Sequence, residues 1–160
     1  MLQIKIVAVG KIKEKSLQEG IREYVKRLSA YTRLTISEVA DEACPDRPLA
    51  AEEERVKARE GERILRALGP QEFVILLDLG GHQLNSVEMA AYINKLALSG
   101  RSNLAFVIGG SLGVSSPVLE RADFQWSFSR LTFPHALMRL VLLEQVYRCM
   151  KINAGETYHK

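Results

Sequence analysis

Three short stretches in the second half of the chain place glycine, hydroxyl and aromatic residues at the ends of apolar runs. Residues 104–108 (LAFVI) run directly into Gly109 and Gly110, and a further glycine follows three residues on. Residues 73–79 (FVILLDL) end in the same way at paired glycines, and residues 126–134 (WSFSRLTFP) end in a proline. Because glycine lets main-chain N–H groups approach a flat or anionic ligand, the pattern predicts a ligand site. A tight strand-to-helix turn is the alternative interpretation.

The apolar runs before these corners predict buried strands. Continuous β-branched and aromatic residues are typical of strands covered on both faces of a parallel sheet. Ligands of such sheets bind beyond the carboxyl ends of the strands. We therefore expect the three corners to form one composite pocket.

The whole chain alternates between strand-like and helix-like segments. Periodicity and turn signals predict strands at residues 3–9, 34–39, 73–79, 104–108 and 124–129. They predict helices at residues 16–29, 50–68, 86–99, 116–122 and 135–151, with Asn85 or Ser86 capping the third and Ser116-Pro117 beginning the fourth. This order predicts an α/β fold, a mainly parallel sheet flanked by helices on both faces, in a single domain of residues 1–160.

The composition is that of an ordinary globular protein. Of 160 residues, 47% are hydrophobic and 26% charged. No segment approaches the ~20 apolar residues of a membrane span, and the N-terminus resembles a strand rather than a signal peptide. A net charge of +3 permits a nucleic-acid partner. The two cysteines, Cys44 and Cys149, form no disulfide framework, so we expect reduced thiols in a cytoplasmic protein.

Several common chemistries lack their sequence signatures. The glycines at 109–113 are spaced G-G-x-x-G rather than G-x-G-x-x-G, and no carboxylate follows about twenty residues later, which disfavours a nicotinamide dinucleotide site. The G-x-S-x-G elbow of serine hydrolases and the phosphate-binding loop after Gly10 are both absent. The histidines and cysteines have no metal-ligand spacing, so we expect no metal.

The last predicted helix carries charges among bulky apolar residues. Arg139, Glu144 and Arg148 do not lie on one polar stripe, and burying such groups costs several kcal/mol unless they are paired. A solvated face is the alternative. Near the N-terminus, Lys11, Lys13 and Lys15 make one connection basic, either as a solvated loop or as an RNA contact.

Taken together, these motifs carry a family resemblance. The segment FVIGGSLG at residues 106–113, the segment SFSRLTFPH at 127–135, the pattern Arg139-x₄-Glu144-Gln-x-Tyr-Arg and the tail Tyr158-His159 occur in this order. The chain resembles the RlmH-type (YbeA-like) ribosomal RNA methyltransferases of the SPOUT superfamily over its whole length. It departs from the pattern at Leu112, where a more polar residue is expected.

The resemblance implies a fold, a partner and a reaction. The fold is a parallel α/β sheet whose C-terminal part is threaded into a trefoil knot, and the protein is a homodimer. The reaction is transfer of a methyl group from S-adenosyl-L-methionine to N3 of a pseudouridine in 23S rRNA of the assembled ribosome. Carried over by motif, the cofactor-binding residues are Leu77, Gly109, Phe128, Ser129, Arg130, Leu131, Thr132 and Phe133.

The resemblance also suggests residues around the target base. We expect Arg139, Tyr158 and His159 to organise it, with His135 or His159 as a proton acceptor, although water could take that proton. Two alternatives stay open at this point. One is a non-catalytic ribosome- or RNA-binding protein on the same fold, and the other is a transfer RNA methyltransferase of the same superfamily.

Overall fold

Five strands and five helices alternate along the chain. The structure, a computed structural model, describes all residues from 1 to 160. The strands are β1 (Leu2–Val9), β2 (Thr32–Val39), β3 (Phe73–Gln83), β4 (Asn103–Ile108) and β5 (Phe124–Ser127). The helices are α1 (Lys15–Leu28), α2 (Ala50–Ala67), α3 (Ser86–Leu98), α4 (Ser116–Arg121) and α5 (His135–Asn153). The predicted α/β class and the predicted order of elements are both confirmed.

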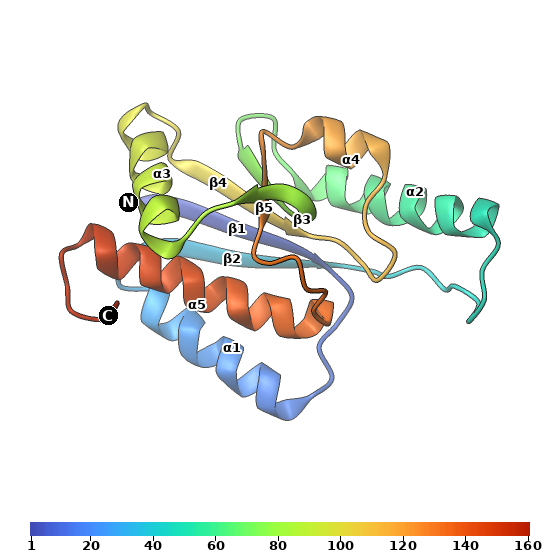
Figure 1. The fold of residues 1–160 in the computed structure, drawn as a ribbon, viewed down its shortest axis with the longest axis horizontal. Coiled ribbons are helices and arrows are strands. Elements are labelled where there is room, and N and C mark those ends of the chain that lie inside the picture. The colour runs from blue at the N-terminus through green and yellow to red at the C-terminus, as the bar shows by residue number, and fades with distance from the viewer.

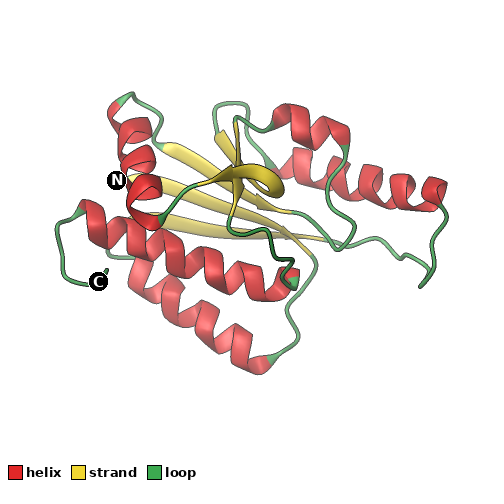
Figure 2. Cartoon of the chain, in the orientation of Figure 1, coloured by secondary structure: helices red, strands yellow, loops and turns green.

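All five strands join one parallel sheet in the order β2-β1-β4-β3-β5 (Figures 1 and 2). The central strands are continuous apolar runs, as expected for strands covered on both faces. Because every strand runs in the same direction, the carboxyl ends of β4, β3 and β5 lie at one edge of the sheet. The three corners singled out from the sequence are therefore brought to that edge together.

Helices cover both faces of the sheet (Figure 1). On one face, α1, α3 and α5 enclose the larger core, in which Phe106, Leu142 and Leu143 are fully buried. On the other face, α2 and α4 enclose a smaller core built around Val74, Leu76 and Val107. Successive side chains of a strand point to opposite faces, which explains why neighbouring residues of β3 and β4 belong to different cores. None of the helices combines the length and the apolarity needed to cross a membrane.

The third strand differs from its prediction at the paired glycines. The strand assignment continues through Gly80 and Gly81 to Gln83, but Leu77 and His82 both pair with Trp126, so residues 78–81 form a bulge at which β3 curls (Figure 1). A methyl group added at Gly81 would lie 2.6 Å from the Gln125 carbonyl carbon. Gly81 therefore lies in a bend of the chain and also packs closely against the main chain of β5. The fifth strand is correspondingly shorter than predicted and ends at Ser127.

The other boundaries agree closely with the sequence. Asn85 is the residue that caps α3, because its side chain accepts a hydrogen bond from the Glu88 N–H at 2.8 Å. The fourth helix is capped one residue earlier than predicted, at Ser115, with proline in its first turn. The threading of the chain into a knot stays a prediction.

The two adjacent glycines of β3 give a matched pair of substitutions. We expect Gly81→Ala to lower the free energy of unfolding by about 2 kcal/mol, because its methyl group would overlap the main chain of β5. Gly80→Ala, whose nearest neighbour is an Asp78 carboxylate oxygen at 3.4 Å, should change it by less than about 0.5 kcal/mol. Urea unfolding curves of both variants check this. Equal stability of the two variants would contradict the packing role of Gly81.

Candidate ligand cavity at the carboxyl edge of the sheet

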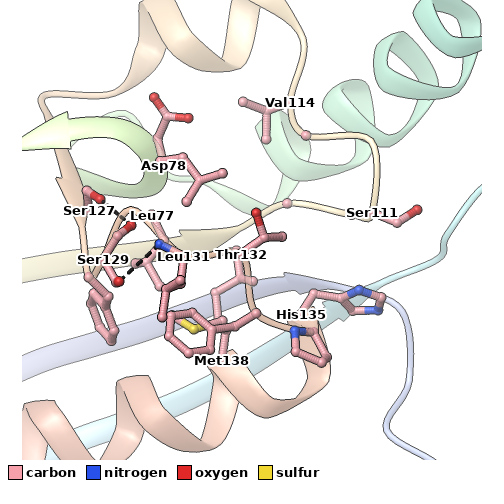
Figure 3. Close-up of a pocket in the computed structure, with 18 of the residues that line it drawn as sticks. Leu77, Asp78, Ser111, Val114, Ser127, Ser129, Leu131, Thr132, His135 and Met138 are labelled. Atoms are coloured by element: carbon pink, nitrogen blue, oxygen red, sulfur yellow. Dashed lines mark hydrogen bonds between the residues drawn. The ribbon is translucent and has the colours of Figure 1, made fainter.

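A cavity of about 450 Å³ opens at the carboxyl edge of the sheet, where the three corners meet (Figure 3). Its wall consists of 19 residues, nine of them hydrophobic. They come from the end of β3, from the connection between β4 and α4, and from the segment that leads from β5 into α5: Leu77, Asp78, Leu79, Ile108, Gly109, Gly110, Ser111, Gly113, Val114, Trp126, Ser127, Phe128, Ser129, Leu131, Thr132, Phe133, Pro134, His135 and Met138. The predicted composite pocket is therefore present.

The segment between β5 and α5 is held by its own hydroxyl groups. The Ser127 hydroxyl donates to the Ser129 carbonyl oxygen at 3.0 Å, and the Leu131 N–H donates to the Ser129 hydroxyl oxygen at 3.0 Å (Figure 3). Short serine side chains compete well for neighbouring main-chain groups, so they shape a loop that has no ladder partner. The loop leaves Leu131 67% exposed and Phe133 38% exposed at the cavity rim. Apolar side chains at a rim favour contact with a ligand or a partner.

The glycine corner after β4 is a closed turn. The Gly113 N–H donates to the Gly110 carbonyl at 3.1 Å, and Gly113 has φ = 90°, a conformation that side chains other than glycine rarely adopt. Gly109 and Gly110 do not have positive φ. Methyl groups there would lie 2.6 Å from Val114 Cγ1 and 2.6 Å from Glu60 Oε1, respectively. Close packing by these protein groups, rather than a special backbone conformation, accounts for this glycine pair.

Eight of the twelve residues singled out from the sequence line the cavity. Leu77, Gly109, Phe128, Ser129, Leu131, Thr132, Phe133 and His135 all belong to its wall. Arg130 lies among them in sequence, but its side chain is exposed and does not line the cavity. Leu112 is also outside the wall, between Ser111 and Gly113, which belong to it.

Two side chains of the wall that could take part in binding or chemistry were not predicted from the sequence. Asp78 contributes a carboxylate that makes no ion pair, and Met138 contributes a thioether one helical turn into α5. Asp78 directly follows Leu77, so the end of an apolar strand was the available signal. Met138 had no sequence signal, because a methionine in an apolar helix is ordinarily core.

Arg139 lies behind the cavity rather than in its wall. The residue is 4% exposed, and its guanidinium donates to Glu38 Oε2 at 2.5 Å and to the Gly10 carbonyl at 3.0 Å. These contacts join the start of α5 to the carboxyl ends of β1 and β2. The pairing that the sequence argument required for a buried arginine is therefore supplied by Glu38. It also anchors the connection that carries Lys11 and Lys13.

The C-terminal tail is bound to the far half of α5. The Tyr158 hydroxyl donates to Glu144 Oε1 at 3.0 Å, and Arg148 donates to the same oxygen at 2.5 Å. His159 Nδ1 lies 3.2 Å from Arg148 Nη1. Burial raises the pKa of Tyr158, and hydrogen bonding with Tyr24 and Glu144 adds to this rise, so the hydroxyl stays a neutral donor. Since α5 rises about 1.5 Å per residue, Glu144 and Arg148 lie about 9 Å and 15 Å along the helix from Met138 of the cavity wall. Neither Tyr158 nor His159 lines the cavity of its own chain.

Comparisons with known proteins agree with this geometry. Residues 2–159 match the family model described as "Predicted SPOUT methyltransferase". The chain belongs to this SPOUT methyltransferase family. It is 66% identical over its full length to the "Ribosomal RNA large subunit methyltransferase H" of Desulfitobacterium hafniense, which it also covers completely. The identically named protein of Carboxydothermus hydrogenoformans is 58% identical over 99% of this chain and 100% of its own.

A solved structure supports the SPOUT fold at much lower sequence similarity. The probable methylase family protein of Haemophilus influenzae superposes with a TM-score of 0.54 at 13% identity. The match covers 100% of this chain and 72% of that one. At this identity the likeness concerns the fold alone.

One buried carboxyl behind the glycine corner gives a prediction about pH. Glu60 is 5% exposed, and burial is the main cause that raises the pKa of its carboxyl above the usual 4.5. The hydrogen bond from the Glu42 N–H and the charge of Arg63 oppose this rise, whereas the charges of Asp41 and Glu42 add to it. The neutral carboxyl therefore contributes stability that is complete below about pH 4.5 and is lost as the pH rises through the raised pKa. Because the side chain at position 60 stays neutral at every pH in Glu60→Gln, the Tm of this variant should increase relative to that of the unchanged protein as the pH rises.

Calorimetric Tm values from about pH 4 to neutrality measure this difference. Glu62→Gln is the control, because Glu62 lies on the solvated side of α2 at 3.8 Å from Arg66. A Tm difference for Glu60→Gln that stays constant with pH would contradict the raised pKa.

Proposed function

We propose that this SPOUT methyltransferase transfers a methyl group from S-adenosyl-L-methionine to N3 of a pseudouridine in 23S rRNA of the assembled ribosome. The observation that carries the proposal is the 66% identity, over both full lengths, to a protein named for methylation of large-subunit ribosomal RNA. A ribosomal substrate places the enzyme in the cytoplasm. The carboxyl-edge cavity is its reaction centre.

The residues of the cavity fit this cofactor. A volume of about 450 Å³ is in the range of small-molecule sites, and nine hydrophobic residues of the wall stand beside glycines and polar side chains. A flat purine ring can pack against the apolar side chains of Leu77, Leu131 and Phe133. Its edge can bind main-chain groups of the serine-held loop, which is the segment between β5 and α5 that the Ser127 and Ser129 hydroxyls hold. The Asp78 carboxylate complements a cationic ligand. When bound, S-adenosyl-L-methionine supplies a methyl group already activated on a sulfonium.

The protein's part in the reaction is to position the acceptor and handle one proton. The imide N3–H of the base loses its proton as the new bond forms. His135, in the cavity wall at the start of α5, has an imidazole nitrogen that can accept this proton. Arg139 does not touch the cavity, so it acts as a positioning residue through Gly10 and the basic connection. Exposed Lys11, Lys13 and Lys15 on and beside that connection suit the phosphates of RNA.

A homodimer would bring the tail residues to the cavity. Tyr158 is anchored at Glu144, about 9 Å along α5 from Met138 of the cavity wall, and His159 at Arg148, about 15 Å from it. Neither residue lines the cavity of its own chain, so a second copy would supply them to the target base. The exposed apolar side chains Leu79, Leu131 and Phe133 rim the cavity and offer a surface that such a copy can bury. We propose that each reaction centre combines the cavity of one subunit with the tail of the other.

The first experiment measures transfer of labelled methyl from S-adenosyl-L-methionine to ribosomes from a strain that lacks the modification. We expect incorporation into large-subunit RNA. Gly109→Val should lower the rate at least roughly tenfold, because its side chain would displace Val114 from the wall. Gly80→Ala, next to the cavity but free of clashes, is the control that should retain the rate.

The other results have distinct meanings. Cofactor binding without incorporation into ribosomes would overturn the ribosomal substrate and favour transfer RNA. The absence of both would favour a non-catalytic binding protein. Mapping the methylated base in the labelled RNA then tests the N3 position.

Subunit mixing tests the shared reaction centre. Gly109→Val damages the cavity and the double change Tyr158→Phe, His159→Ala damages the tail, so each homodimer should be inactive. Random exchange should restore roughly a quarter of full activity, because half of the dimers are mixed and each mixed dimer has one intact centre. Mixing two tail-damaged preparations is the control. A mixture as inactive as its parents would exclude a tail supplied by the partner.

A further inference from the structure

The Glu60 carboxyl is buried without a cationic partner. Two charged residues of the chain are buried, Arg139 and Glu60, and only Arg139 has an ion pair. Glu60 Oε2 accepts a hydrogen bond from the Glu42 N–H at 3.0 Å, whereas Oε1 has no hydrogen-bond partner. Burying an unpartnered polar atom costs free energy, so a buried carboxyl at this position calls for a compensating structural or functional role.

The unpartnered oxygen lies against the glycine corner of the cavity. The space that a Cβ atom would occupy at Gly110 lies 2.6 Å from Glu60 Oε1, 3.2 Å from Cδ and 3.3 Å from Oε2. Real Cβ atoms do not approach a neighbour so closely, so the carboxyl takes the place of a side chain at Gly110. The carboxyl cannot easily move away, because its other oxygen is held by the Glu42 N–H.

The next residue of α2 packs against the other end of the same turn. A methyl group at Gly61 would lie 2.3 Å from the Ser115 hydroxyl oxygen and 3.3 Å from Val118. Glu60 and Gly61 therefore contact the two ends of the connection between β4 and α4. The cavity uses the opposite side of this connection, where Gly109, Gly110 and Gly113 belong to its wall.

We propose that Glu60 is a positioning residue of the reaction centre, whose carboxyl fixes the main chain at Gly110 and thereby the cofactor-facing wall. This inference rests on the proposed function, because it assumes that S-adenosyl-L-methionine binds in the carboxyl-edge cavity. Gly110 does not have positive φ, so the backbone itself does not require glycine there. Glycine is required at this position because the Glu60 carboxyl occupies the space of a side chain. The absence of a side chain at Gly110 and the carboxyl of Glu60 therefore depend on each other.

A double-variant experiment tests the contact. Calorimetric titration with S-adenosyl-L-methionine gives the Kd of the unchanged protein, Gly110→Ala, Glu60→Ala and the double variant. Gly110→Ala should raise Kd by about tenfold, because its methyl group overlaps a buried carboxyl that has nowhere to go. Glu60→Ala removes that obstacle, so the double variant should bind within about threefold of Glu60→Ala alone. If the methyl group of Gly110→Ala instead entered the cavity, the Glu60→Ala change would not restore the affinity.

A second readout separates positioning from general stability. Glu60→Ala should raise Kd by several-fold while its Tm changes little, because the lost packing is offset by removal of an unpartnered buried carboxyl. Amide hydrogen exchange at residues 110–113 should become faster in this variant without any ligand present. Glu62→Ala, on the solvated side of the same helix, should leave Kd and exchange unchanged.

The outcomes distinguish this inference from the proposed function. If the unchanged protein does not bind S-adenosyl-L-methionine, the proposed function fails, and exchange at residues 110–113 alone decides whether Glu60 fixes the turn. If the unchanged protein binds the cofactor but the Kd of the double variant rises by the product of the two single increases, the role of Glu60 is overturned. The same holds if Glu60→Ala lowers Tm and affinity together without faster exchange at the turn.

Discussion

The pairing of β3 with β4 on one side and β5 on the other is the constraint on which the rest of the structure depends. These three strands are parallel, so their carboxyl ends lie at one edge, and each continues into a segment of the cavity wall. The close approach of Gly81 to the main chain of β5 keeps Trp126 beside the end of β3. Without this pairing, the serine-held loop before α5 would have no wall to face.

The cavity is shaped mainly by packing from behind. Val114 fills the space beside Gly109, and the Glu60 carboxyl fills the space beside Gly110. Glycines in a ligand site are often explained by the approach of the ligand, yet here only Gly113 has a conformation that favours glycine. A site built in this way has a rigid wall before any ligand enters, which favours orientation of a reacting group.

The last helix connects three separate parts of the molecule. Its first turn contributes His135 and Met138 to the cavity, its buried Arg139 binds Glu38 and Gly10, and its far half binds the tail through Glu144. The buried thiol of Cys149 lies in the last part of the same helix, and burial raises its pKa to about 12, which keeps it protonated and inert. The helix therefore holds the N-terminal basic connection, the cavity and the tail in fixed relation.

The sequence by itself determined the order of the elements, the parallel sheet and most of the cavity. Apolar runs of β-branched residues identify buried strands, and parallel strands end at a common edge, so the corners that follow these runs could be placed together from the sequence. The individual residues, such as Leu77 and Gly109, came from the family resemblance. Only the tertiary structure decided which polar residues face the cavity. Glu60 lies in a helix rich in charged residues, where nothing in the sequence marks it as buried, and Arg139 was expected to organise the target base. Their surroundings depend on contacts with Gly110, Glu38 and Gly10, which are distant in sequence and leave no local periodic signal.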